Sequence, residues 1–389
     1  MNKTIIKGMC IMLCLLLAFP VCVKAEDENK MPVTVNAKAA VLVDASTGRV
    51  LAAMNEHDRL YPASVTKIMT LLLVMEAVDS GRLNLTDEVV TSATAAAKGG
   101  SQIWLKEGET MTVDELLRAA AIYSANDACE ALGEHIAGSE EALVQMLNER
   151  AEELGMNDTH FDNCTGLDDT TDTHLTSAFD VALMSVELLK HELIQKYSTV
   201  WMDSLRNGAT ELVNTNKLIR FYEGATGLKT GTTAKAGCCV SASAMREGTH
   251  LVAVIMGSPT SDDRFGGAKA LLNWGFANYE TVTPAVDLSM ITRVNVIGGV
   301  KEDFMPVISE LSPVLIRKGE SGKIEQSVEL ATDVQAPVEA GQRVGTVNFT
   351  LNGETLGEYP LTSEKRIDKL TFAEILRRFL CSFDTLLKK

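Results

Sequence analysis

The chain has 389 residues, of which 46% are hydrophobic and 23% charged, so it is long enough for two globular domains with substantial cores. A formal net charge of −16, with no cluster of lysines and arginines, argues against nucleic-acid binding, because phosphates require such a cluster. The eight cysteines are irregularly spaced, and the five that follow residue 25 are an odd number, which indicates neither a disulfide framework nor a metal site.

Residues 1–25 have the pattern of a signal peptide. Two lysines precede an apolar run at 9–19, and the small residues at 23–25 are typical of a cleavage site. The run is shorter than the about 20 residues that cross a bilayer, and Pro20 interrupts it, which disfavours a membrane-spanning segment. A lipoprotein is also disfavoured, because a bulky valine precedes Cys22. The chain is therefore expected to be exported.

The folded part is predicted to open with a hairpin, since a turn at 45–47 separates two β-rich runs at 39–44 and 48–52. After Pro62, which suits a helix start, residues 68–78 are apolar on nearly every side. A helix with this pattern is buried in the middle of a domain.

A helical period then runs from 113 to 166, with helices expected at 113–117 and 142–154, and it returns at 176–189. Three short strands and an amphipathic helix are predicted next, at 227–232, 238–245, 251–256 and 261–279. Strands at both ends of this region, with helices between them, predict an α/β domain in which helices cover a sheet and also form a separate lobe.

Beyond about residue 281 the sequence becomes rich in β-branched residues and turn signals, including the hairpin signal at Asn352-Gly353. We predict four segments: a signal peptide at 1–25, a catalytic domain at 26–280, an all-β domain at 281–366 and an amphipathic helix at 367–389. The last segment is basic in an otherwise acidic chain, which favours a peripheral membrane anchor. The alternative is a terminal helix docked on the protein.

Three short strings carry the chemistry: Ser64-Val65-Thr66-Lys67, Ser124-Ala125-Asn126 and Lys229-Thr230-Gly231. They are a complete set for acyl transfer without histidine or metal. Residues three apart share one helix face, which puts Lys67 beside the Ser64 hydroxyl as its base. A lysine is neutral near pH 7 when it is desolvated and near another cation, for which Lys229 is the candidate.

The other strings supply binding groups. Ser124 is expected to give a proton to the leaving amine, and Asn126 to hydrogen-bond the substrate amide. Lys229 and Thr230 can hold a terminal carboxylate, while Gly231 lets the substrate lie against the strand.

The backbone N–H groups of Ser64 and Thr232 are candidates for an oxyanion hole. Each of the three strings alone is common by chance. Their order and predicted settings, at the start of a buried helix, in a helical lobe and on a strand, favour a catalytic interpretation.

The sequence resembles the serine-type D-alanyl-D-alanine carboxypeptidases among the low-molecular-weight penicillin-binding proteins. Residues 61–70 are similar to the nucleophile segment of that family, 123–128 to its second motif, and 227–231 to its third. Residues 154–167 follow its helical lobe. The resemblance is high from about 34 to 280 and weaker in the β domain.

The resemblance implies a β-lactamase/transpeptidase-like domain with an antiparallel sheet, followed by a small β-rich domain and a C-terminal amphipathic helix. It implies Ser64 as acylated nucleophile, Lys67 as base and Ser124 as proton shuttle. Substrate-binding groups would be Asn126, Lys229, Thr230 and, for the terminal carboxylate, Arg264. Thr232 departs from the larger side chain that many members carry.

The implied reaction removes the terminal D-alanine from the stem pentapeptide of peptidoglycan through an acyl-enzyme. β-Lactams would acylate the same serine, no cofactor is implied, and the expected location is the outer face of the cytoplasmic membrane or the cell wall.

Two alternatives stay open. A class A β-lactamase has nearly the same motif spacing, but it needs a Glu-x-x-Leu-Asn string that is absent between Asn126 and Lys229; the nearest match, 211–214, is one residue short. A non-catalytic wall-binding or scaffold protein of the same fold is the other alternative, although none of the three motifs is lost.

Overall fold

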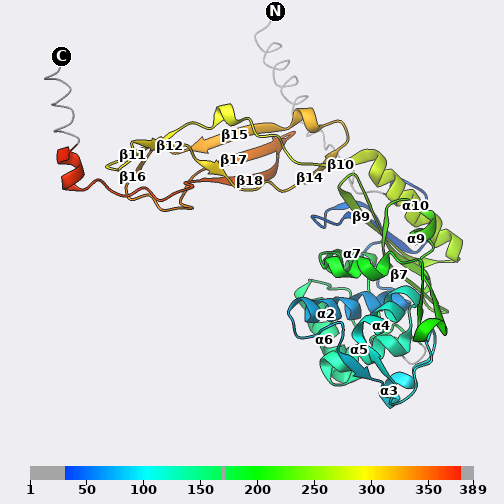
Figure 1. Ribbon diagram of the computed structural model, residues 1–389. Coiled ribbons are helices and arrows are strands. Elements are labelled where there is room, and N and C mark those ends of the chain that lie inside the picture. Colours follow the sequence, from blue (N-terminus) through cyan, green and yellow to red (C-terminus); the bar gives the residue numbers. More distant parts are fainter. Residues whose placement is uncertain (1–30, 169–170, 378–389) are drawn as a thin grey trace, which may run out of the picture.

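The computed structural model describes residues 31–168 and 171–377, so the predicted signal peptide and residues 378–389 of the predicted C-terminal segment lie outside the described residues. Figure 1 shows an α/β domain and an elongated β-rich domain that extends away from it.

A five-stranded antiparallel sheet in the order β2-β1-β9-β8-β7 forms the centre of the α/β domain. Its strands are β1 (Ala39–Asp44), β2 (Val50–Met54), β7 (Ala225–Thr233), β8 (Gly237–Arg246) and β9 (Thr249–Ser258). The predicted hairpin and the three predicted strands are confirmed. Successive residues of a strand face opposite sides, and β1 divides its side chains in this way between two separate cores.

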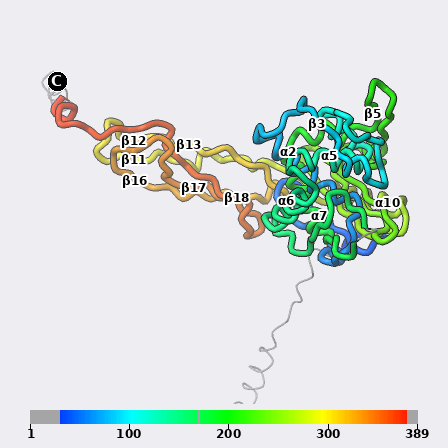
Figure 2. The backbone as a smooth tube through the Cα atoms, turned by 90° about the horizontal axis from the view of Figure 1, so that it is seen from below, coloured from blue at the N-terminus to red at the C-terminus, as the bar shows by residue number. Residues whose placement is uncertain are grey.

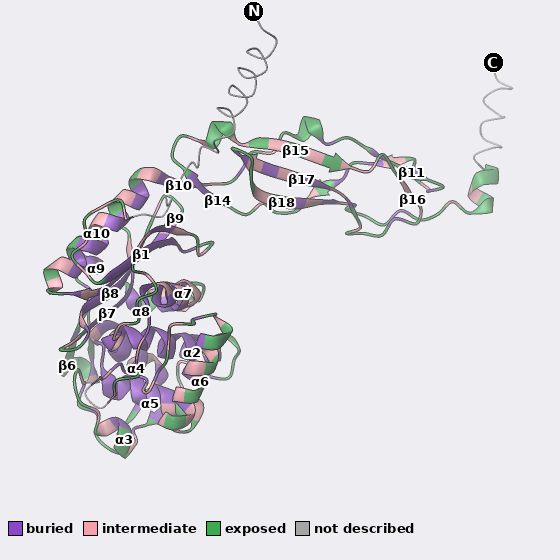
Figure 3. Ribbon diagram, turned by 180° about the vertical axis from the view of Figure 1, so that it is seen from behind, coloured by how far each residue is buried: buried purple, intermediate pink, exposed green. Residues whose placement is uncertain are grey.

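Helices cover both faces of the sheet (Figure 3). On one face lies α10 (Ser261–Asn278), where the missing side chain of Gly275 allows close approach, since a Cβ there would lie 2.5 Å from a methyl carbon of Leu251. The short α9 (Leu218–Phe221) packs into the same core. The opposite face packs against α7 (Ala178–Leu189), which also contacts α2 (Lys67–Asp79).

The helical lobe surrounds α2, which is buried along nearly its whole length, as predicted. Its other members are α3 (Ala93–Ala96), α4 (Val113–Arg118), α5 (Asn126–Ala137) and α6 (Glu140–Glu153). Two short elements lie beside the sheet instead, with η3 (Glu192–Ile194) against α7 and α8 (Gln195–Ser198) against β7. Two small two-stranded sheets that we did not predict complete the domain. In the first, β3 (Glu88–Val90) pairs with β4 (Thr110–Thr112) across a connection that contains α3. The second is a hairpin of β5 (Met202–Leu205) and β6 (Thr210–Val213), with η4 (Arg206–Gly208) in its turn.

The β-rich domain is joined to the α/β domain through β10 (Tyr279–Val282), which directly follows α10 and pairs with β14 (Val314–Arg317). Two further sheets have the orders β12-β11-β16 and β13-β18-β17-β15. Their elements, with two short 3-10 turns, are η5 (Leu288–Met290), β11 (Val294–Ile297), β12 (Asp303–Phe304), β13 (Val307–Ile308), η6 (Ser321–Lys323), β15 (Glu325–Leu330), β16 (Asp333–Gln335), β17 (Arg343–Leu351) and β18 (Glu354–Thr362). The predicted hairpin is confirmed, with Asn352 and Gly353 both at positive φ between β17 and β18.

The chain leaves this domain at the end opposite to the α/β domain (Figure 2). Residues 372–377 are helical, and the remainder of the predicted segment 367–389 beyond them is outside the described range. No helix in the described part of the chain is both long enough and apolar enough to cross a membrane.

Candidate active site

Ser64 lies in the 3-10 turn η1 (Ala63–Thr66), which leads directly into α2. The structure places Lys67, the first residue of α2, beside it: the Lys67 ammonium donates hydrogen bonds to Ser64 Oγ at 2.8 Å and to the carbonyl oxygen of Thr165 at 3.0 Å. Lys67 is fully buried, and this burial lowers its pKa to about 8. A neutral amine 2.8 Å from a hydroxyl can accept its proton.

Lys229 is buried in β7, and its ammonium has no hydrogen-bond partner among the residues that the structure describes. Burial, followed by the charge of Lys67, holds the pKa of Lys229 well below its usual value. We expected both burial and Lys229 to lower the pKa of Lys67. Burial does lower it, and the repulsion between the two groups lowers the pKa of Lys229.

Ser124 stands where helical backbone is interrupted, after the π-helical turn η2 (Ala119–Tyr123) and before α5. Its φ of 69° is in the left-handed region, and its buried hydroxyl has no hydrogen-bond partner in the described chain. Asn126 is held by its backbone N–H, which donates to the Ser101 carbonyl at 2.7 Å, and by its side-chain amide nitrogen, which donates to the Gly99 carbonyl at 2.6 Å. Its side-chain oxygen is left as an acceptor.

The strand β7 lies directly against the nucleophile turn. A Cβ on Gly231 would be 2.7 Å from the carbonyl oxygen of Pro62 and 3.0 Å from the backbone nitrogen of Ser64. The sequence suggested that this glycine makes room for the substrate, but the structure gives it a further reason, which is the close packing of the protein's own backbone. Next to it, Thr230 Oγ1 donates to Thr215 Oγ1 at 2.8 Å.

Arg264, which the resemblance suggested as a carboxylate-binding group, is buried behind the end of β7. Its guanidinium Nη1 donates to the Gly231 carbonyl at 2.9 Å, to Thr232 Oγ1 at 2.8 Å and to the Cys239 carbonyl at 3.2 Å. The side chain therefore fixes the strand that carries Lys229, and it orients the exposed Thr232.

Sequence analysis missed a histidine that supports the nucleophile turn. His174 Nδ1 accepts from the backbone N–H of Asp162 at 2.9 Å, so the neutral ring carries its proton on Nε2, which lies 2.8 Å from Thr66 Oγ1. The Thr66 hydroxyl in turn donates to the Ala63 carbonyl at 2.9 Å. Burial lowers the pKa of His174 to about 4. A lone histidine in a polar loop carries no signal that would have identified this role.

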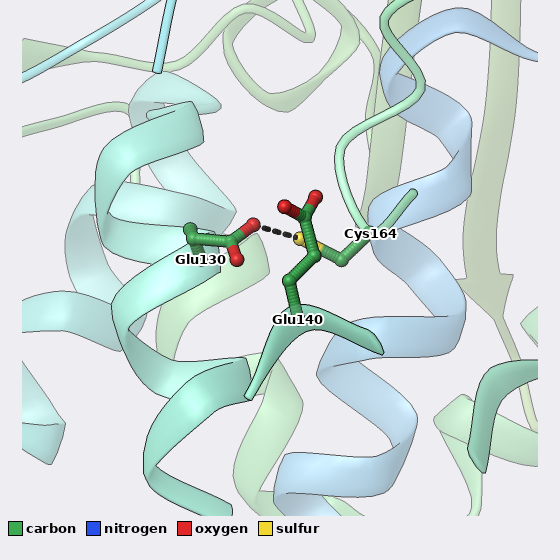
Figure 4. Close-up of side chains that lie close together, drawn as sticks. All are labelled: Glu130, Glu140 and Cys164. Carbon is green, nitrogen blue, oxygen red and sulfur yellow. Dashed lines mark hydrogen bonds between the residues drawn. The ribbon is translucent and has the colours of Figure 1, made fainter. Parts of the chain in front are cut away.

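A second missed cluster is shown in Figure 4, where the Cys164 thiol donates to the Glu130 carboxylate at 2.9 Å and Glu140 projects toward both. Their ligand atoms lie within 4.8 Å of one another, a spacing that metal sites also have. Here the Lys98 ammonium lies 3.2 Å from the Glu130 carboxylate and 2.6 Å from that of Glu140. The positive charge that balances this cluster is therefore a side chain of the protein itself.

The fold and the three strings agree with comparisons to known proteins. The family model described as D-alanyl-D-alanine carboxypeptidase matches residues 24–260. The chain belongs to the D-alanyl-D-alanine carboxypeptidase family. A second model, described as the C-terminal domain of penicillin-binding protein 5, matches residues 279–369.

Relatives of this carboxypeptidase match over most of its length. D-alanyl-D-alanine carboxypeptidase DacF of Bacillus subtilis is 41% identical over 346 residues, covering 88% of each chain. DacC of Escherichia coli is 33% identical over 363 residues, covering 91% of this chain and 90% of the relative. The crystal structure of penicillin-binding protein 5 from Haemophilus influenzae superposes with a TM-score of 0.72 at 30% identity, covering 87% of this chain and 99% of the other.

The predicted family and fold class are thus confirmed, and the chain is a D-alanyl-D-alanine carboxypeptidase of the penicillin-binding type. Among the three functions that the sequence left open, the comparisons favour this one over a β-lactamase or a non-catalytic scaffold.

Proposed function

We propose that this carboxypeptidase cleaves the terminal D-Ala-D-Ala bond of peptidoglycan stem pentapeptides through an acyl-enzyme on Ser64. The observation that carries the proposal is the buried Lys67 amine, 2.8 Å from Ser64 Oγ and with its pKa lowered to about 8 by burial. Lys67 is therefore close enough to Ser64, and neutral at a low enough pH, to act as the base for a serine nucleophile.

In the first step, Ser64 Oγ attacks the carbonyl carbon of the penultimate D-alanine while its proton passes to neutral Lys67. The backbone N–H of Ser64, next to Gly231, is suited to hold the developing oxyanion, together with the N–H of Thr232. Ser124 then delivers a proton to the departing D-alanine nitrogen. Water attacks the ester by the reverse route and regenerates Ser64.

Substrate binding follows from the polar groups that the protein leaves without partners. The side-chain oxygen of Asn126 would accept the substrate amide N–H, and the Lys229 ammonium with the Thr230 hydroxyl would bind the terminal carboxylate. Gly231 and Arg264 would act by positioning β7, and Thr232 would contribute at its exposed end. β-Lactams would acylate Ser64 and inhibit the enzyme.

We also propose that the protein is exported and works at the outer face of the cytoplasmic membrane or in the cell wall, in peripheral contact with lipid through residues 367–389. In the described part of that segment, Phe372, Ile375 and Leu376 are exposed by 80%, 51% and 46%, at the three- and four-residue intervals of an amphipathic helix.

The test is incubation of the purified protein with a stem pentapeptide, measuring released D-alanine. The Ser64→Ala protein should release none, whereas Ser80→Ala, at the exposed far end of the same helix, should match the unaltered protein. Release of D-alanine by Ser64→Ala would rule out the mechanism.

A further inference from the structure

A cleft of about 800 Å³ lies beside the second catalytic string. One wall is the segment 102–109, and the other is the turn of the hairpin formed by β5 and β6. Tyr123, which directly precedes Ser124, lines the cleft. The proposed reaction uses none of the residues that line it.

Trp104 is held in this cleft in an unusual backbone conformation. Its φ is 60°, a region that bulky residues rarely adopt, and its side chain is 74% exposed. The amides on both sides are fixed by one carboxylate, since Ile103 N–H donates to Asp127 Oδ1 at 3.2 Å and Leu105 N–H donates to Asp127 Oδ2 at 3.0 Å. Asp127 directly follows Asn126, so the outward position of the indole is coupled to a substrate-binding string. Backbone strain of this kind clusters at active sites and ligand-binding sites, which makes Trp104 a candidate binding residue.

The opposite wall is fixed to the same segment. Arg206 Nη1 donates to the Ile103 carbonyl at 2.7 Å, and its Nε donates to the Glu109 carboxylate at 2.8 Å. Arg206 therefore joins the two walls of the cleft through hydrogen bonds.

The cleft is linked through Thr215 to the groups that would hold the leaving amine. The backbone N–H of Thr215 donates to the Ile122 carbonyl at 3.2 Å, and its hydroxyl accepts from Thr230 at 2.8 Å. The chain that leaves β6 thus connects the π-helical turn η2, which precedes Ser124, with β7. In the proposed reaction, Ser124 protonates the departing nitrogen and Thr230 helps to bind its carboxylate. Tyr123, next to Ser124, and Glu211, four residues before Thr215, both line the cleft, so the cleft is the nearest open space for the side chain of the departing residue.

The chemistry of the cleft favours a cationic side chain. Two carboxylates of the lining, Glu107 and Glu211, form no ion pair with any other described residue. Within the described ranges, the lining has one cation without an ion pair, Lys106. Arg206 and Glu109 neutralise each other at 2.8 Å. An ammonium group on an aliphatic chain would be attracted by the face of the Trp104 indole and by the excess of carboxylates.

We propose that this cleft binds the side chain of the amine-side residue when that residue is a D-amino acid with an aliphatic ammonium side chain. The inference rests on the proposed function and deepens it. The enzyme would cleave D-Ala–D-X bonds in which X has such a side chain, and would transfer the acyl group from Ser64 to free amines of this class. In the transfer, the neutral amine nitrogen attacks the ester carbon, the bond from that carbon to Ser64 Oγ breaks, and the proton lost by nitrogen passes through Ser124 and Lys67 to Ser64 Oγ.

The experiment compares kcat/KM for four diacetyl-L-lysyl-D-alanyl-D-X peptides, with X as D-alanine, D-lysine, D-norleucine or D-glutamate. Trp104→Ala should lower the ratio of D-lysine to D-alanine about fivefold, and the ratio of D-norleucine to D-alanine by less. Phe221→Ala removes an exposed aromatic ring outside the cleft and should leave every ratio unchanged. The double variant Glu107→Gln with Glu211→Gln, at exposed positions, should lower the D-lysine ratio and raise the D-glutamate ratio.

If the kcat/KM ratios are unchanged in both cleft variants, the inference is overturned. It is also overturned if Trp104→Ala lowers kcat/KM for the D-lysine and the D-norleucine peptides by the same factor. If the unaltered protein cleaves none of the four peptides, the proposed function itself fails, which is a distinct result.

Discussion

Lys67 is buried with only neutral oxygen atoms as hydrogen-bond acceptors. They belong to Ser64 and Thr165, and no carboxylate forms an ion pair with its ammonium within the described chain. An amine without a counter-ion in a buried site favours its neutral form. The same burial that is costly for a charged lysine therefore prepares Lys67 to act as a base.

This predicts how the acylation of Ser64 depends on pH. With the pKa of Lys67 near 8, the neutral fraction rises about tenfold per pH unit below that value and levels off above it. The second-order rate constant for acylation by a labelled penicillin should follow the same curve. In the Lys67→Arg protein, whose guanidinium stays charged, this rate constant should be about 100 to 10,000 times lower. A rate constant that stays flat from about pH 6 to pH 9 would contradict the assignment.

His174 predicts a loss of stability in mild acid. The pKa of His174 is about 4 in the folded protein, against 6.5 for the ordinary side chain. Between these values the unfolded chain binds a proton that the folded chain does not, so the free energy of unfolding falls as the pH falls, by about 3 kcal/mol in all. This contribution is fully present above pH 6.5 and absent below about 4.

Urea unfolding at several pH values measures this effect. His174→Gln retains an acceptor for the Asp162 N–H and a donor for Thr66, but it does not titrate. Its stability should therefore depend less on pH across this window. Equal pH slopes in the two proteins would contradict the account.

At the scale of elements, the contact between β7 and η1 decides the geometry of the site. Gly231→Ala should push the strand away from the nucleophile turn, because the added Cβ would meet backbone atoms of Pro62 and Ser64 that have little room to move. We expect a loss of about 1 to 3 kcal/mol in stability and slower acylation by penicillin.

Gly266→Ala is the matched control. Gly266 lies in α10 with nothing within 4 Å of the added Cβ, so the change should stabilise the protein by about 0.5 to 1 kcal/mol and leave acylation unaffected. If Gly231→Ala acylates at the normal rate, close packing of β7 on η1 is not required for catalysis.

The elements that sequence analysis predicted correctly are those with strong periodic patterns. The uniformly apolar α2 and the strands β7, β8 and β9 belong to this group. The π-helical turn η2 was missed because its sequence of three alanines, isoleucine and tyrosine is compatible with an ordinary helix. The β5–β6 hairpin was missed because its strands are short and most of their residues are at least partly exposed. They bury little apolar surface and so give no clear alternating pattern.

For the whole molecule, the three strings and their order could be predicted, but the groups that support them could not. Thr66 and His174, which are hydrogen-bonded, are 108 residues apart in the sequence, and Cys164 and Glu130 are 34 residues apart. Each of these residues alone has an unremarkable local pattern, and only the folded topology brings them together. The same holds for the link between domains, where Leu315 of β14 packs into the core of the α/β domain.

The far end of the molecule carries a prediction about membranes. Phe372, Ile375 and Leu376 are exposed apolar residues near Lys369 and Arg377, at the end of the β-rich domain opposite to the active-site domain. An amphipathic basic segment binds anionic bilayers through both apolar insertion and charge. The mature protein should therefore sediment with vesicles that contain anionic lipid, and less so as salt is raised.

Replacing these three apolar residues with serine should reduce the sedimented fraction by removing the apolar part of the binding. A matched control is Leu288→Ser, because Leu288 is 68% exposed but lies in the same β-rich domain outside the terminal segment. Both proteins should acylate with penicillin at the same rate, since neither change is near Ser64. If the triple variant binds vesicles as well as the control does, the described start of the segment does not contribute to membrane contact, and the contact would have to be made elsewhere in the chain.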